Sequence, residues 1–240
     1  MDFTSYVAAA IGFAPPIALM LWTLQRYTYP KVERPYFSDP RLFGMFTVGI
    51  VIGALLYLVS IFLSAEYAFV GFLLEEAVKL MIMNMPRFQR RADTPFYAFG
   101  LSAGMATALA YGVINRALTM TGFDALAITI MVAYSIMTAL LQISTGTTIG
   151  MGVARGTPWP FFGQAVVVNL AYVLMLAPSS TAFVGSGAMA SVLFVAAFVF
   201  VALYYYYVHQ KMLPLYVREA LVKLGENKPK KARKVPRTKD

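Results

Sequence analysis

Three ionisable side chains lie close together in the middle of an apolar segment that runs from Tyr67 to about Asn84: Glu75, Glu76 and Lys79. A charged group at the centre of a bilayer costs about 2.5 to 3.5 kcal/mol by insertion scales, so such residues usually face the bundle interior and have a function. Lys79 follows Glu75 by four residues and Glu76 by three. On a helix, it can therefore neutralise one of the two carboxylates. The other carboxylate then needs a proton, water or hydrogen-bond donors.

Two kinds of role fit these carboxylates. A mid-membrane glutamate can act as general base on water in peptide hydrolysis, if an electrophilic partner or an oxyanion donor lies nearby. Alternatively, the carboxylates belong to a structural cluster that fixes one helix against others. Gln142 and Asn169 fall at a similar depth in their own apolar segments, and we also assign Asn115 to this predicted polar cluster. Ser135 and Thr138 offer further hydroxyl donors.

The histidine and cysteine content favours the structural role. The chain has no cysteine, which excludes disulfides and thiol chemistry. Its single histidine, His209, lies beyond the last apolar run, so we expect no histidine-based metal site or catalytic dyad inside the membrane. We therefore predict neither a metal site nor a cofactor.

The composition indicates a polytopic membrane protein. Of the 240 residues, 59% are hydrophobic and 13% are charged, whereas about a quarter of the residues in soluble domains are charged. The mean hydropathy is +0.66. A transmembrane helix needs about 20 mostly apolar residues. We predict an all-α fold of seven transmembrane helices, at about 4–25, 42–64, 67–85, 95–118, 124–152, 159–178 and 187–209.

The distribution of lysine and arginine predicts the orientation of these helices. The loops after the second, fourth and sixth predicted helices contain no lysine or arginine. The loops after the first, third and fifth contain Arg26, Lys31, Arg34, Arg41, Arg87, Arg90, Arg91 and Arg155. Because basic loops stay in the cytoplasm, we expect the N-terminus outside and the C-terminus in the cytoplasm. The alanine-rich, cysteine-free composition suits a multi-pass protein of a prokaryotic plasma membrane.

We divide the chain into a transmembrane domain, residues 1–212, and a basic cytoplasmic tail, residues 213–240. The segment 228–239 is basic, contains proline and has few apolar residues, so we expect the tail to be at least partly disordered. The tail's charge suits a topology determinant held near anionic lipid headgroups. The same charge would also allow contact with RNA of a docked ribosome, the one nucleic-acid partner that we consider.

Small residues predict close helix packing. Four of them lie four residues apart in the fourth predicted helix, and pairs with the same spacing occur in the second and fifth. These residues are Gly100, Gly104, Ala108, Gly112, Gly49, Gly53, Gly146 and Gly150. Such a face lets another helix approach closely. We expect this packing to lie within the bundle; the alternative is packing against a different protein.

A family resemblance rests on the order of four segments. They are Glu75-Glu76-Ala77-Val78-Lys79, Phe99-Gly-Leu-Ser-Ala-Gly104, Gly112-Val-Ile-Asn115 and the opening Gly12-Phe-Ala-Pro-Pro-Ile-Ala-Leu. In their order along the chain, these segments resemble the PrsW and CAAX-protease superfamily of glutamate-dependent intramembrane proteases. Within it, the chain is most similar to the anterior-pharynx-defective subunit, the seven-helix scaffold of γ-secretase.

The chain departs from these families at residues that matter for activity. PrsW-like proteases carry a second glutamate where this chain has Ile114, and a histidine in the following helix where it offers Gln142 or Ser135. The scaffold subunit has histidines in its fifth and sixth helices, and the corresponding positions here are Gln142 and Asn169. The resemblance therefore implies a scaffold that has lost the catalytic partners of its first glutamate pair.

Three hypotheses follow from the sequence. The preferred one is a non-catalytic membrane scaffold that packs against another integral membrane protein, such as an intramembrane protease, or against a second copy of itself. The second is a glutamate-dependent intramembrane protease that uses Glu75 or Glu76 as the base, with Gln142 and Asn169 as oxyanion donors. The third is a transporter or lipid-binding protein that uses the same polar cluster.

Overall fold

The computed structural model describes residues 3–28, 31–32, 36–63, 68–182 and 187–226, and all regular structure in this part of the chain is helical. The helices are α1 (Phe3–Leu24), α2 (Asp39–Phe62), α3 (Ala68–Met83), α4 (Thr94–Thr121), α5 (Ala125–Arg155), α6 (Pro158–Ala182), α7 (Gly187–Tyr207) and α8 (Leu213–Glu226). A π-helical segment, η2 (Val208–Met212), joins α7 to α8 without a break. Among the described residues, six helical segments are long and apolar enough to cross a membrane. The chain is thus an all-helical protein of the multi-pass membrane type.

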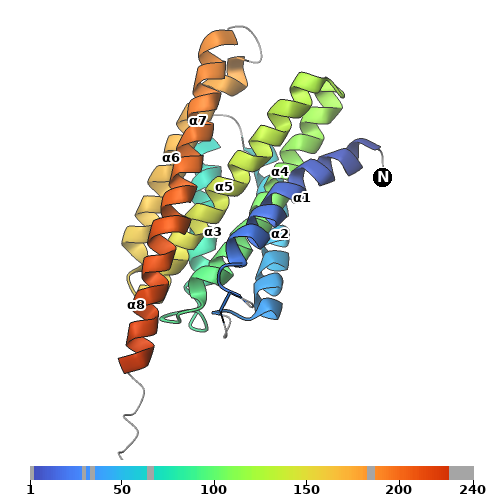
Figure 1. Cartoon of the computed structure of the whole chain (residues 1–240). Coiled ribbons are helices and arrows are strands. Elements are labelled where there is room, and N and C mark those ends of the chain that lie inside the picture. Colours follow the sequence, from blue (N-terminus) through green and yellow to red (C-terminus); the bar gives the residue numbers. More distant parts are fainter. Residues whose placement is uncertain (1–2, 29–30, 33–35, 64–67, 183–186, 227–240) are drawn as a thin grey trace, which may run out of the picture.

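Helix α4 is the centre of the bundle. In its most apolar window, 89% of the residues are buried. Helices α6 and α7 lie on one side of the α4–α5 pair, and helices α1 and α2 lie on the other side (Figure 1). The glycines of α4 face α2: a Cβ atom on Gly104 would lie 2.0 Å from the carbonyl oxygen of Phe46. From α2, Gly49 in turn faces the carbonyl oxygen of Leu101, again at 2.0 Å from a built Cβ atom. The predicted small-residue face is therefore occupied within this chain by α2.

Helix α5 packs on another face of α4 through glycines of its own. A Cβ atom on Gly146 would lie 1.7 Å from the Ser102 hydroxyl oxygen, and one on Gly150 would lie 2.6 Å from the Ala98 Cβ atom. Helix α5 also contacts α3, α6 and α7.

The basic loops lie together at one end of the bundle, the end at which α8 begins (Figure 1). The guanidinium group of Arg155 forms an ion pair with Glu219 of α8 at 2.9 Å. The backbone N–H of Arg90 donates to the carbonyl oxygen of Val153 across 3.3 Å. This arrangement agrees with the prediction that these loops share one face; the side of a membrane on which they lie remains a prediction.

The C-terminal region differs from the expected division at residue 212. Residues 213–226 form α8, and its side chains Leu213, Tyr216 and Val217 are buried. These three residues lie on one face of the helix, because they are three and four positions apart. The basic residues of this region mask the amphipathic spacing in the sequence. Residues 227–240 lie outside the described part of the chain.

Candidate functional site

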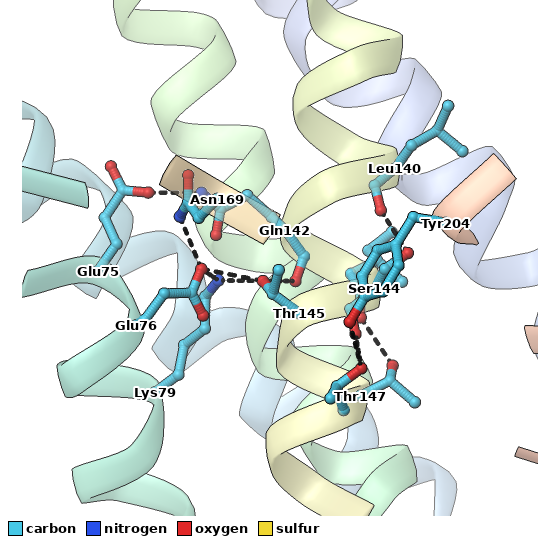
Figure 2. Close-up of polar contacts among 12 residues, drawn as sticks. Glu75, Glu76, Lys79, Leu140, Gln142, Ser144, Thr145, Thr147, Asn169 and Tyr204 are labelled. Carbon is cyan, nitrogen blue, oxygen red and sulfur yellow. Dashed lines mark hydrogen bonds and ion pairs between the residues drawn. The ribbon is translucent and has the colours of Figure 1, made fainter. Parts of the chain in front are cut away.

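The carboxylate of Glu76 lies at the centre of a buried cluster. Its Oε1 atom accepts hydrogen bonds from Lys79 Nζ at 2.8 Å, Asn169 Nδ2 at 2.8 Å and the Thr145 hydroxyl at 3.0 Å. Lys79 Nζ also donates to Thr145 Oγ1 at 2.8 Å. Glu76, Lys79 and Thr145 are each 0% exposed, and Asn169 is 1% exposed. Figure 2 shows these side chains converging from three helices.

Three helices supply the cluster because of simple helical spacing. Glu76 and Lys79 are three residues apart on α3, and Gln142 and Thr145 are three apart on α5, so each pair shares a face. Asn169 comes from α6. We call Glu75, Glu76, Lys79, Gln142, Thr145 and Asn169 the carboxylate cluster. A buried ion pair of this kind is destabilising unless its remaining donors and acceptors are satisfied. Here Glu76 Oε1 has three donors, while Glu76 Oε2 and Asn169 Oδ1 have no partner in the described part of the chain.

Glu75 has a different environment from its neighbour. The Gln142 amide nitrogen donates to Glu75 Oε2 at 2.5 Å. Beside this contact, Glu75 lines a cavity of about 180 Å³ that lies among α2, α3, α4, α5 and α6. Thr138 and Tyr172 also line this cavity. Glu76 is thus enclosed by protein, whereas Glu75 faces an open space.

The structure brings together most of the predicted polar cluster, but not all of it. Asn115 lies elsewhere, in the lining of a cavity among α1, α2 and α4. The Ser135 hydroxyl donates to the carbonyl oxygen of Ile11 in α1 at 2.7 Å. Conversely, Thr145 was missed, although it follows Gln142 by one helical turn. The spacing of Thr138, Gln142 and Thr145 was the signal that could have identified it.

The prediction that His209 lies outside the apolar bundle is wrong. The helix continues through η2, and the His209 side chain is only 2% exposed. Its Nε2 atom lies 3.4 Å from the Thr147 hydroxyl, and its Nδ1 atom lies 3.0 Å from the carbonyl oxygen of Tyr205. Thr147 projects from α5 on the side away from the glutamates (Figure 2). A histidine is therefore present in the bundle, but its contacts are with Thr147 of α5, Tyr205 of α7 and the ring of Phe99 in α4.

The described ranges contain no candidate metal site made of histidine, cysteine or acidic side chains. No group of three or more histidine, cysteine, aspartate or glutamate side chains that could hold a metal ion occurs there. The chemistry of the carboxylate cluster is instead that of an ion pair with amide and hydroxyl donors.

Comparisons of the chain with protein-family models, with curated proteins and with solved structures find no match. The resemblance to glutamate intramembrane proteases and to the scaffold subunit of γ-secretase therefore stays a prediction. Function has to be inferred from the geometry of the cluster and the cavity.

Proposed function

We propose that the chain is a non-catalytic integral membrane scaffold, in which the carboxylate cluster locks α3 against α5 and α6. The observation that carries this proposal is the enclosure of Glu76. Three donors converge on its Oε1 atom, and both the carboxylate and Lys79 are 0% exposed. A group held in this way fixes helices relative to one another but has no route to water.

The hydrogen bonds of the two amides also support a structural role. Hydrolysis needs donors directed at the oxygen of the substrate that becomes negative. The two candidates were Gln142 and Asn169, and their amide nitrogens donate instead to Glu75 and Glu76. With these donors already in use, the geometry favours cohesion of the bundle over stabilisation of an oxyanion.

The proposal includes a topology and a partner. It has seven crossings, with α3 as the third, the N-terminus outside and the C-terminus in the cytoplasm of a prokaryotic plasma membrane. The partner is another integral membrane protein, such as an intramembrane protease, or a second copy of this chain. Since α2 covers the small-residue face of α4, we place the partner on outward-facing helices. Helix α7 offers exposed Val192, Val195, Val199 and Leu203.

The test compares two neighbouring isosteric substitutions, Glu76→Gln and Glu75→Gln, in the full chain in mild detergent. Removing the Glu76 charge leaves Lys79 buried without a counter-ion, and such changes cost about 3 to 5 kcal/mol. We therefore expect a large fall in thermal stability for Glu76→Gln and a much smaller one for Glu75→Gln. Cross-linking before solubilisation should capture the partner with the wild-type chain. Equal thermal stability of the two variants would contradict the proposal that Glu76 locks these helices together.

A second candidate function, a glutamate-dependent intramembrane protease, is favoured by the cavity at Glu75. It would use Glu75 as general base, with the Thr138 and Tyr172 hydroxyls in the same cavity. The measurement is cleavage of a single-span peptide by the reconstituted chain. The scaffold proposal expects no cleavage. Reproducible cleavage by the wild type, abolished by Glu75→Gln in a protein that still folds, would replace the scaffold with the protease.

A further inference from the structure

The cavity beside Glu75 has an incomplete set of hydrogen bonds. Of the residues that line it, Thr138, Gln142 and Tyr172 are each more than nine-tenths buried. In the described part of the chain, Thr138 Oγ1, Gln142 Oε1 and Tyr172 Oη have no hydrogen-bond partner. A buried polar atom that is left unpaired lowers the stability of the fold. Glu76 Oε2 and Asn169 Oδ1 on the enclosed side are also unpaired in the described part of the chain, but only the Glu75 side has a cavity that could hold another molecule.

The three unpaired oxygens can all accept a hydrogen bond from a ligand. The amide nitrogen of Gln142 is already used on Glu75, so only its carbonyl oxygen, an acceptor, is left for a ligand. When it is ionised, the Glu75 carboxylate is likewise an acceptor. The Thr138 and Tyr172 hydroxyls can accept as well as donate. A ligand that presents several N–H groups therefore matches all four side chains.

The cluster has one carboxylate more than it has cationic groups. Glu75 and Glu76 provide two carboxylates, whereas Lys79 provides one ammonium group, which binds Glu76 and Thr145. No lysine or arginine is among the residues that line the cavity. Glu75 is consequently the carboxylate for which the cluster supplies no direct cationic partner.

The remaining wall of the cavity is apolar and aromatic. It includes Tyr57, Phe72, Tyr134, Leu109 and Leu141. An ammonium group is attracted to the face of an aromatic ring, and an alkyl group is stabilised by burial. A bare metal ion would gain nothing from such an apolar wall. The volume of about 180 Å³ also far exceeds the roughly 10 to 15 Å³ that one water needs.

We propose that this cavity binds the ammonium group of a small alkylamine. Glu75 is the counter-ion, the free oxygens of Gln142, Thr138 and Tyr172 accept the N–H groups, and the aromatic wall receives the alkyl chain. This site is independent of the scaffold role, because the enclosed Glu76 and Lys79 form a separate part of the cluster.

The experiment measures saturable binding of n-butylammonium chloride to the full chain in detergent, by calorimetry and by the shift in melting temperature. n-Butanol controls for the alkyl chain, and sodium chloride at equal ionic strength controls for the positive charge. We expect binding of n-butylammonium alone, with at least a tenfold loss of affinity in Glu75→Gln. Absence of saturable binding, equal binding by Glu75→Gln, or equal binding of n-butanol would overturn the proposal. Saturable stabilisation by sodium alone would also overturn it, in favour of an inorganic cation.

Two further variants test the site without touching a charge. Tyr172→Phe removes one unpaired hydroxyl, and Phe72→Leu removes one aromatic ring while keeping an apolar wall. We expect each to lower the affinity for n-butylammonium about threefold to tenfold. Unaltered affinity in both folded variants would contradict the proposed orientation of the alkylammonium ligand in the cavity. This test does not depend on whether Glu75→Gln folds. Scaffold function would be unaffected by such a result, since it is measured by stability and by capture of a partner.

Discussion

At the scale of single residues, two adjacent glutamates have separate roles. Glu76 has donors on α3, α5 and α6 and is enclosed, whereas Glu75 has one amide donor and a cavity in front of it. The difference arises because consecutive positions on a helix point about 100° apart, at 3.6 residues per turn. One residue thus faces the junction of α3, α5 and α6, and the other faces the cavity.

The Glu76–Lys79 pair gives the first prediction. Lys79→Met should destabilise the folded protein by about 3 to 5 kcal/mol, because it leaves a buried carboxylate without its counter-ion. The double substitution Lys79→Met with Glu76→Gln should recover a large part of this loss. The control is Lys31→Met, at an exposed lysine. Melting temperatures of the wild type, the two single cluster variants, the double variant and Lys31→Met in one detergent give the answer. Purely additive effects of the two cluster substitutions would argue against a coupled pair.

Thr145 gives the second prediction. Its hydroxyl donates to Glu76 and accepts from Lys79, so Thr145→Val, which keeps the shape, should cost about 1 to 3 kcal/mol. Thr129→Val is the matched control on the same helix, because the Thr129 hydroxyl is exposed and bonds only to its own helix backbone in the described structure. Thermal unfolding of both variants should show a clear loss only for Thr145. An equal effect of the two substitutions would mean that the Thr145 contacts contribute nothing specific.

Sequence reasoning placed the glutamates with Lys79, Gln142 and Asn169 because charged and amide groups are rare in apolar segments, and few partners exist for them. Thr145 escaped notice for a physical reason. Ser144, Thr147 and Thr148 each donate to the carbonyl oxygen four residues earlier in α5. A hydroxyl that can be satisfied by its own helix does not by itself indicate a contact with another helix, so only the spacing from Gln142 pointed to Thr145.

At the scale of helices, α4 determines how close its neighbours come. The long apolar runs and their boundaries were predictable, because proline, glycine and basic residues separate them. The choice of α2 as the neighbour of the glycine face was not predictable, since the small-residue spacing permits any helix with a matching face. The continuation through η2 into α8 was also missed, because His209 and Lys211 interrupt the apolar pattern.

The contact between α2 and α4 gives the third prediction. A Cβ atom on Gly104 would lie 2.0 Å from the carbonyl oxygen of Phe46, whereas one on Gly44 of α2 would meet nothing within 4 Å. Gly104→Ala should therefore lower stability by about 1 to 3 kcal/mol through overpacking, and Gly104→Leu should prevent folding. Gly44→Ala should be neutral or slightly stabilising. Equal melting temperatures for Gly104→Ala and Gly44→Ala would refute the close approach of these helices.

At the scale of the whole molecule, the basic loops and the start of α8 share one end of the bundle (Figure 1). This agreement with the charge pattern arises because consecutive antiparallel helices alternate the end at which each loop lies. The fold alone does not determine which end of the bundle faces the cytoplasm. The positive-inside rule supplies the choice of side.

The absence of cysteine from the sequence makes the fourth prediction simple to test. Lys31→Cys introduces a single thiol at the basic end, and Phe123→Cys introduces one between α4 and α5, at the other end. A membrane-impermeant maleimide added to intact cells should label the second variant and not the first. Permeabilised cells should show labelling of both. The reverse pattern in intact cells would invert the proposed orientation.

The links of Glu76 to α5 and α6 also bear on how the chain is made. Its partners Thr145 and Asn169 come 69 and 93 residues later. At about 5 to 20 residues per second, synthesis leaves on the order of 3 to 20 s during which α3 exists before these partners. Throughout that interval, Glu76 has Lys79 on its own helix but lacks the donors of α5 and α6 that make its burial tolerable. Stable integration of α3 should therefore wait for α5 and α6, which makes the second half of the chain a folding requirement for the first.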